Sequence, residues 1–198
     1  VHSIEITEVE DVAKEATEQV PVTLFLRAHG VPLQVEKTLE KLSAENKFFT
    51  YADCTCPYVK KIHKIAAEYS AQENVFILMG CESHPEVVGI MSYFVGEKYV
   101  FDSLSSFEKA VKNGRLVNLH KKTPILAAQT TFNLSEWEKT QKFLKNLCTN
   151  PIIFDTICSV TEKRQVEAAA LSRDNDFMIV IGSRGSSNSA KLYSICRA

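Results

Sequence analysis

Two cysteines stand one residue apart in the segment "YADCTCP", residues 51–57, where Cys54 and Cys56 precede Pro57. A hydrophobic run leads into this segment, and a basic stretch of helical character follows it. Thiols at such a junction can form a redox pair or bind a soft metal. A disulfide and simple side-chain packing are further alternatives, and this segment alone does not decide between them.

Another cysteine, Cys158 in "DTICSVT", also follows a predicted strand. Thiolates from separate strands, such as those of Cys56 and Cys158, can hold a soft metal or an iron–sulfur cluster between them. Two thiolates are too few for a closed zinc site or a four-cysteine cluster, and their spacing alone favours buried thiols. We assign structural roles to three further cysteines: Cys81, Cys148 and Cys196.

A glycine- and serine-rich turn, "GSRGSSNSAKL" at residues 182–192, opens a predicted helix. Backbone N–H groups at a helix N-terminus, together with serine and asparagine side chains, form a cradle for an anion. Ser186, Ser187 and Asn188 suit a phosphate or diphosphate, because several donors reach several oxygens. The GK[ST] element of a Walker loop is absent. An ordinary helix cap explains the same residues equally well.

Two histidines and a carboxylate also follow predicted strands. His29 in "AHGV" and His84 in "SHPE" could pair with phosphate oxygens or move protons, although a solvated loop histidine is the simpler interpretation. Glu86 and Thr130 could pass a proton to a bound substrate. Glu86 could equally be an acidic residue in the first turn of a helix, where it favours the dipole.

Short β-branched or aromatic runs alternate with segments of helical length, which predicts an α/β fold with mostly parallel sheets. Ser103 and Ser135 are the predicted N-caps of two helices. The predicted strands are 22–27, 48–52, 75–80, 98–101, 116–119, 125–128, 152–154 and 177–182. The predicted helices are 33–45, 58–72, 86–92, 104–113, 135–147, 161–173 and 188–197.

The chemically interesting residues all follow these strands. Ligands of open parallel sheets bind beyond the carboxyl ends of the strands. Cysteine, histidine, glutamate, threonine, serine and asparagine occur together in the loops after six of the predicted strands. We therefore expect these loops to meet at one site.

Composition excludes several classes of protein. The net charge is −1 and there is no basic block, so no nucleic-acid or membrane-surface partner is indicated. The hydrophobic runs are too short to span a bilayer, and the acidic N-terminal segment does not resemble a signal peptide. The sequence therefore predicts a cytoplasmic protein. In that reducing compartment, six irregularly spaced cysteines without a CxxC are poorly explained as a set of disulfides.

Six motifs occur in one order along the chain: "RAHGV", "DCTCP", "SHPEVVG", "AQTT", "DTICSVTEKRQ" and "GSRGSSNS". In this order they resemble the 4-hydroxy-3-methylbut-2-enyl diphosphate reductases, the IspH/LytB family. The resemblance covers nearly the whole chain, and the ordered set is specific where one motif alone would be weak.

The resemblance implies a trefoil of three α/β lobes around a central 4Fe–4S cluster. It divides the chain into part of a first lobe (1–56), a complete second lobe (57–154) and part of a third lobe (155–198). It also implies the reaction of the family, in which two electrons and protons remove the substrate hydroxyl as water and give isopentenyl and dimethylallyl diphosphates. Ferredoxin or flavodoxin is the implied electron donor.

The motifs also imply roles for individual residues. Cys56 and Cys158 match two of the three cluster cysteines, whereas Cys54 stands where the family has a small residue. Glu86 and Thr130 match the proton-delivery pair. The positions that match substrate-binding residues, or lie beside them, are His29, His84, Gln129, Thr131, Ser186, Ser187 and Asn188.

The sequence also departs from the family pattern. The motif with the first cluster cysteine, a substrate-binding histidine after it and a serine near the C-terminus have no counterpart here. We therefore expect this chain by itself neither to hold an intact cluster nor to turn over. Two alternatives remain: a non-catalytic module that binds phosphate or diphosphate, and a structural α/β lobe that assembles with the absent segments as a separate chain.

Overall fold

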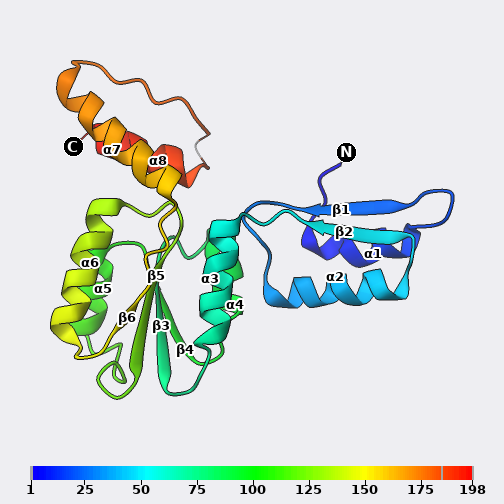
Figure 1. Cartoon of the computed structure of the whole chain (residues 1–198), viewed down its shortest axis with the longest axis horizontal. Helices are drawn as coiled ribbons and strands as arrows, with labels where there is room; N and C mark the ends of the chain where they lie inside the picture. Colours follow the sequence, from blue (N-terminus) through cyan, green and yellow to red (C-terminus); the bar gives the residue numbers. More distant parts are fainter. Residues whose placement is uncertain (1, 184, 198) are drawn as a thin grey trace.

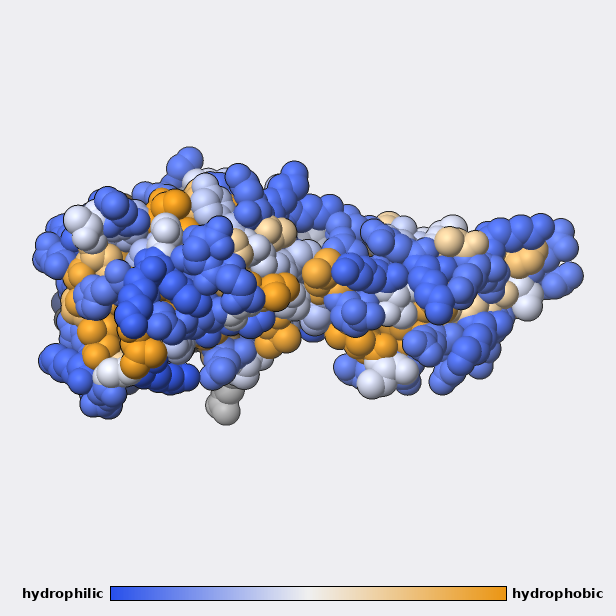
Figure 2. Space-filling view, turned by 90° about the horizontal axis from the view of Figure 1, so that it is seen from below, coloured by the Kyte–Doolittle hydropathy of each residue, from blue (hydrophilic) through white to orange (hydrophobic). Residues whose placement is uncertain are grey.

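The computed structural model describes residues 2–183 and 185–197. It is an α/β structure whose described strands form two parallel sheets, which confirms the predicted fold class. The smaller sheet and its helices extend to one side of the larger sheet, and the last two helices lie above it (Figure 1). Seen from below, the surface narrows between these two parts and is mostly hydrophilic (Figure 2).

The first sheet has two strands, β1 (Val22–Leu26) and β2 (Phe49–Asp53). The connection between them contains α2 (Leu33–Glu45), which matches the predicted helix 33–45. The short helices η1 (Ile6–Glu8) and α1 (Val9–Glu15), which the sequence analysis missed, precede β1. Val9 and Ala13 of α1 pack with Leu39 and Phe49 to form the small core of this part.

The second sheet has four parallel strands in the order β4-β3-β5-β6. They are β3 (Asn74–Met79), β4 (Glu97–Phe101), β5 (Thr123–Ala128) and β6 (Ile152–Ile153). Four helices lie between or before them: α3 (Pro57–Glu68), α4 (Pro85–Ser92), α5 (Leu104–Lys112) and α6 (Leu134–Leu147). Helices α3 and α4 cover one face of the sheet, and α5 and α6 cover the other (Figure 1).

The central strand β3 is hydrophobic throughout because both of its faces are buried. Ile77 packs in the core beneath α5 and α6, where Phe107 and Trp137 lie. The next residue, Leu78, points to the opposite core beneath α3 and α4, with Ile62. This alternation of side chains along one strand fixes which helices lie on which face.

Helices α7 (Ser159–Asp174) and α8 (Ser187–Cys196) pack against each other after β6. The predicted strand 177–182 between them is wrong, because this segment forms no strand in the structure. Its alternating side chains Phe177, Ile179 and Ile181 are 90%, 86% and 92% exposed. A β-strand requires a neighbour for its backbone hydrogen bonds, and none of the described strands pairs with this segment.

Two further predictions of local structure were wrong. Residues 116–119 form a turn, held by a hydrogen bond from the Leu119 N–H to the Leu116 carbonyl, while both leucine side chains pack into the core. The N-cap of α6 is Asn133 rather than Ser135, because the Asn133 Oδ1 accepts a 2.9 Å hydrogen bond from the Glu136 N–H. The predicted cap at Ser103 is confirmed.

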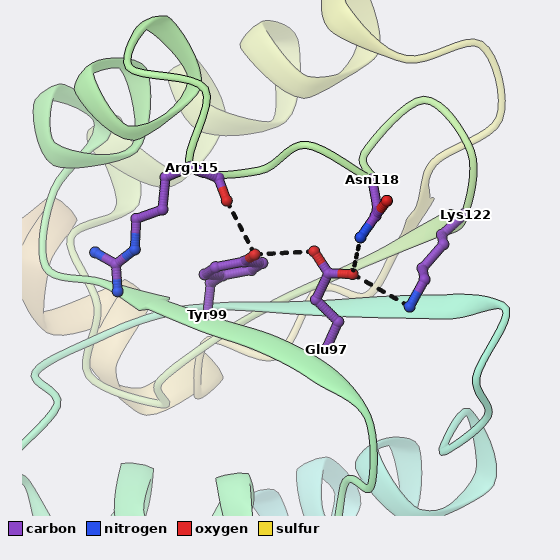
Figure 3. A network of polar contacts seen from close by, with 5 residues as sticks. All are labelled: Glu97, Tyr99, Arg115, Asn118 and Lys122. Atoms are coloured by element: carbon purple, nitrogen blue, oxygen red, sulfur yellow. Dashed lines mark hydrogen bonds and ion pairs between the residues drawn. The ribbon is translucent and has the colours of Figure 1, made fainter.

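A polar network fastens the loop after α5 to strand β4 (Figure 3). Glu97 on β4 accepts hydrogen bonds from Asn118 Nδ2 at 2.9 Å and from the Tyr99 hydroxyl at 2.9 Å. Lys122 Nζ lies 3.1 Å from the same carboxylate. Burial raises the pKa of Glu97, but these donors outweigh burial and lower it overall. The network holds the loop that leads into β5, and β5 ends at the candidate site.

No helix within residues 2–183 and 185–197 combines the length and hydrophobicity needed to cross a membrane.

The Glu97 network gives a stability prediction. Glu97→Gln removes the charge that Asn118, Tyr99 and Lys122 surround, so we expect the free energy of unfolding at pH 7 to fall by about 1–2 kcal/mol. Urea denaturation measures it, with the exposed Glu138→Gln as control and an expected change below about 0.5 kcal/mol. Because folding lowers the pKa of Glu97, the difference from wild type should shrink as the pH falls below the ordinary value of 4.5. Equal effects of both substitutions would contradict this role.

Candidate functional site

The residues singled out by the sequence lie where strands give way to turns and helices. His29 follows β1, Cys56 follows β2, and His84 follows β3. The segment 129–131 follows β5, and Cys158 follows β6. Parallel strands end at the same edge of a sheet, so the second sheet brings its three loops to one edge. Hydrogen bonds and ring contacts then connect these loops to the turn after β1 and to α8.

His29 and His84 come from different sheets and meet edge to face. Their ring centroids lie 5.3 Å apart at an interplanar angle of 77°. Burial lowers the pKa of both rings, and the nearby charge of Arg27 lowers both further. The positive charge of His29 also lowers the pKa of His84. The free site therefore favours a neutral imidazole pair.

His84 is also the N-cap of α4, which fixes its hydrogen bonding. Its Nδ1 accepts a 3.2 Å hydrogen bond from the Glu86 N–H. A ring nitrogen that accepts carries no proton, so the proton of neutral His84 lies on Nε2. Nε2–H is thus a donor that the cap does not use.

Glu86 is buried in the second position of α4, with 2% of its surface exposed. Its Oε1 accepts a 2.7 Å hydrogen bond from the Thr130 N–H, and its Oε2 accepts a 2.9 Å hydrogen bond from the Thr130 hydroxyl. Burial raises the pKa of Glu86, and the two bonds from Thr130 offset part of that rise. A buried carboxyl with a raised pKa holds its proton to higher pH and can act as an acid.

The residues on either side of Thr130 connect two more segments. Gln129 Oε1 accepts a 3.1 Å hydrogen bond from the Cys81 N–H, and its Nε2 is buried without a partner among the described residues. The Thr131 hydroxyl donates a 2.8 Å hydrogen bond to the Ser187 hydroxyl of α8. The loop after β5 therefore reaches both the loop after β3 and the N-terminus of α8.

Cys56 and Cys158 stand at equivalent places, as the N-cap residues of α3 and α7. Helix N-termini favour negative charge, which suits a thiolate ligand. The two helices meet at their first turns, where the Tyr58 hydroxyl and the Ser159 hydroxyl are 2.7 Å apart. Lys61 Nζ also donates a 3.0 Å hydrogen bond to the Asp155 carbonyl, close to Cys158 in the sequence. The structure thus brings together the segments that carry both cysteines.

Backbone hydrogen bonds tie each cysteine to the rest of the site. The Cys56 N–H donates to the Ala28 carbonyl at 3.0 Å, directly before His29. The Cys158 N–H donates to the Thr130 carbonyl, also at 3.0 Å. These contacts form a closed circuit. It runs from the His29 turn to His84, and then through Glu86 and Thr130 to Cys158. The contact between Ser159 and Tyr58 leads on to Cys56, whose N–H bonds back to the His29 turn. We refer to this arrangement as the site circuit.

A cavity of about 510 Å³ borders the site circuit beside α8. His84, Ser186 and Ser187 line it, whereas Asn188, the third residue of the predicted anion cradle, is not among its lining residues. Ser186 is also the N-cap of α8, because its Oγ accepts a 3.3 Å hydrogen bond from the Ser189 N–H. Asn188 Oδ1 is buried without a partner among the described residues. The remaining lining residues include Cys81, Asp102, Ser103, Asn133, Glu136 and Lys191.

The other cysteines differ from one another in burial. Cys148 is buried in the core of the second sheet, as expected for a packed thiol. Cys81, to which we assigned a structural role, is instead exposed and lines the cavity. Cys54 is exposed, and all six cysteines are free.

Sequence reasoning missed the pairing of Tyr58 with Ser159. Each residue lies next to or close to a candidate cysteine, but neither belongs to a sequence pattern for a site. Their contact depends on how α3 and α7 pack, so no sequence signal could have found it. Within the described part of the chain, no group of three histidine, cysteine, aspartate or glutamate side chains could hold a metal.

Gly30 allows the His29 turn to pack tightly against α3. Its φ of +74° is in the left-handed region, and a Cβ there would lie 2.8 Å from Cε1 of His63. His63 is buried and stacks on Tyr93 with a centroid distance of 4.2 Å, and burial lowers its pKa to about 4. Because the space beside this neutral ring is filled, only glycine fits at position 30 without displacement.

Comparisons with known proteins show the family to which the chain belongs. A model of the LytB protein family matches residues 1–198. A 4-hydroxy-3-methylbut-2-enyl diphosphate reductase of Clostridium tetani is 37% identical over 88% of this chain and 25% of its own length. One of Caldanaerobacter subterraneus subsp. tengcongensis is 34% identical over 87% of this chain and 56% of its own length. The chain therefore spans only part of the length of these relatives.

Two solved structures resemble the fold. The structure of E-1-hydroxy-2-methyl-but-2-enyl-4-diphosphate reductase from Plasmodium falciparum matches 88% of this chain and 52% of its own, with a TM-score of 0.76 and 25% identity. A structure of (E)-4-hydroxy-3-methyl-but-2-enyl diphosphate reductase, the terminal enzyme of the non-mevalonate pathway, matches 98% of this chain and 68% of its own. Its TM-score is 0.59 and its identity 27%.

Gly30 gives a prediction with an internal control. Gly30→Ala should reduce the free energy of unfolding by at least about 1 kcal/mol more than Gly114→Ala, because only Gly30 has a close neighbour. Gly114 has a similar φ of +68° and no atom within 4 Å of an added Cβ, so its substitution reports the backbone cost alone. Chemical denaturation of both variants measures the difference. Equal losses would show that the turn does not depend on its packing against His63.

Proposed function

Because the chain belongs to the LytB protein family, we propose that it supplies part of the active site of a 4-hydroxy-3-methylbut-2-enyl diphosphate reductase. This oxidoreductase of the non-mevalonate pathway removes the substrate hydroxyl as water, at the cost of two electrons and two protons, and forms isopentenyl and dimethylallyl diphosphates. The site circuit is the main observation that supports the proposal. It joins two thiols, a buried acid and the edge of an anion cradle through contacts of the described residues.

A 4Fe–4S cluster fits this chain in part. Cys56 and Cys158 are soft ligands at two neighbouring helix N-termini, and we propose that they hold the cluster. The described residues offer no third ligand grouped with them, so we propose that a further thiolate comes from outside the described residues. When bound, the cluster would supply electrons and an open coordination position for the substrate hydroxyl.

The diphosphate would bind between α8 and the histidine pair. Ser186, Ser187 and Asn188 lie in the first turn of α8, where backbone N–H groups face an anion. His84 offers its Nε2–H from the other wall of the cavity, and His29 lies against its ring. Thr131 supports the cradle through its hydrogen bond to Ser187, and Gln129 has a buried Nε2 without a partner among the described residues.

Proton delivery is assigned to Glu86 and Thr130. Burial raises the pKa of Glu86, which favours its acid form. When Oε2 carries the proton, the Thr130 hydroxyl beside it can accept that proton and pass its own toward a substrate. The Thr130 carbonyl also accepts from the Cys158 N–H, which places the relay next to a proposed cluster ligand. Protons would therefore arrive where the hydroxyl departs.

The same proposal also implies an electron donor, a cellular compartment and a division of the chain into lobes. Ferredoxin or flavodoxin would provide the electrons, and the reaction would take place in the cytoplasm. Residues 1–56 would be part of the first lobe, residues 57–154 the complete second lobe, and residues 155–198 part of the third. Each lobe would contribute to one central site.

The cluster ligands are tested in a chimera that provides the segments absent here. The matching 173 residues of the Caldanaerobacter reductase are replaced by this chain, and iron content and turnover with a reduced dye are measured after anaerobic reconstitution. We expect Cys56→Ser and Cys158→Ser each to abolish the cluster and turnover, because each removes a thiolate. Cys54→Ser, two residues from Cys56, is the control and should retain both.

Two results would contradict this assignment. The first is a cluster that survives the loss of Cys56 or Cys158 but not of Cys54. The second is a stable, active 4Fe–4S centre in the isolated chain, which would show that it needs no outside thiolate. If the unsubstituted chimera binds diphosphate but takes up no iron, the non-catalytic diphosphate module is the better interpretation.

The proton relay is tested in the same chimera. Glu86→Gln preserves the shape of the side chain and removes the acid, so kcat should fall by about 10²- to 10⁴-fold with little change in KM. An acid works only while protonated, so unsubstituted turnover should decline as the pH rises through the raised pKa of Glu86. Glu86→Gln should lose this dependence. Glu82→Gln, exposed in the same loop, is the control. A normal pH profile in Glu86→Gln would exclude the role.

A further inference from the structure

Among the described residues, the proposed diphosphate cradle contains little positive charge. Ser186, Ser187 and Asn188 are neutral, and burial together with Arg27 lowers the pKa of both histidines. A diphosphate carries several negative charges, and its transfer from water into a neutral pocket is costly. A permanent cation in the same cavity would offset that cost.

Acidic residues add negative charge to the cavity, which opposes the binding of a diphosphate further. Asp102 and Glu136 both line it. Hydrogen bonds from Ser106 and Ser103 lower the pKa of Asp102, so this carboxylate stays ionised. Among the described residues that line the cavity, Lys191 is the one lysine or arginine. Its positive charge also contributes to the lowered pKa of Asp102.

The position of Lys191 on α8 directs it toward the cradle. It follows Ser187 by four residues, so both side chains lie on the same face of the helix. Its Nζ lies 5.4 Å from the centroid of the Phe132 ring. The residue before Phe132 is Thr131, whose hydroxyl contacts Ser187 at 2.8 Å. The ammonium group therefore lies above the loop that holds the cradle in place.

We propose that Lys191 is a positioning residue for the diphosphate, and that its ammonium group neutralises and orients the phosphate held by the N-terminus of α8. This proposal rests on the proposed function, because it takes the anion cradle as given. Phe132 holds the lysine ammonium group over its ring through a cation–π contact. The positive charge of Lys191 would also weaken the repulsion between the bound anion and the Asp102 carboxylate.

Calorimetric titration of the chain with inorganic pyrophosphate tests the proposal. Lys191→Met preserves the length of the side chain and removes the charge, so the Kd should rise about tenfold, which corresponds to about 1.4 kcal/mol. Lys191→Arg should restore most of the affinity. Lys37→Met, an exposed lysine on α2, makes the same change of net charge in the other sheet region and should leave the Kd unchanged.

A salt series separates a charge effect from a structural one. Wild-type affinity should fall as the sodium chloride concentration rises, and that of Lys191→Met should fall less steeply. A purely structural role, through the contact with Phe132, would lower the melting temperature of Lys191→Met without changing the salt dependence. Melting temperatures of all variants are measured alongside.

The double variant Ser186→Ala/Ser187→Ala distinguishes this proposal from the proposed function. If the double variant binds pyrophosphate more weakly while Lys191→Met binds normally, the cradle exists and the role of Lys191 is wrong. If the wild-type chain does not bind, or the double variant binds as well as wild type, the cradle itself is wrong, and the role of Lys191 is rejected with it. Both proposals are supported if Lys191→Met and the double variant each bind pyrophosphate more weakly and Lys191→Arg restores the affinity.

Discussion

The pairing of Glu86 with Thr130 is the constraint on which the arrangement of the site depends. A carboxyl group with 2% exposure is stable only when its oxygens have partners, and Thr130 provides both its backbone N–H and its hydroxyl. These bonds fix the N-terminus of α4 against the end of β5. The same residue accepts from the Cys158 N–H through its carbonyl, so one threonine sets the positions of the acid and of a proposed cluster ligand.

Parallel sheets explain why so many functional groups meet here. Within each sheet the strands end at one edge, and α3, α4 and α7 begin at the site after β2, β3 and β6. Helix α8 begins at the site as well, although the segment before it forms no strand. Their N-cap residues are Cys56, His84, Cys158 and Ser186, and each carries a candidate functional side chain. Helix N-termini collect unpaired N–H groups and positive potential. They therefore suit both thiolate ligands and an anionic substrate.

The sequence predicted most of this fold because its signals are local. The uninterrupted hydrophobic run of β3 and the amphipathic α2 are unmistakable, and the bounds of α2 were predicted without error. The failures concern tertiary partners. The segment 177–182 has the alternation of a strand but no neighbour to pair with, and Leu116 and Leu119 face the core from a turn. Likewise, the ordered motifs pointed to the candidate site residues, but only packing reveals that Tyr58 meets Ser159 or that Lys191 lies beside Phe132.

The electrostatics of the free site imply that substrate and protons bind together. Burial and Arg27 keep His29 and His84 neutral, and the proximity of the two rings opposes a second positive charge. A bound diphosphate reverses this balance, because negative oxygens stabilise the imidazolium form and raise the pKa of both rings. Protonation of the rings and binding of the anion are linked equilibria, so conditions that favour protonation also increase the affinity for the anion. In the proposed enzyme, the histidine wall would therefore remain uncharged until the anion binds, and it would gain protons as the substrate arrives.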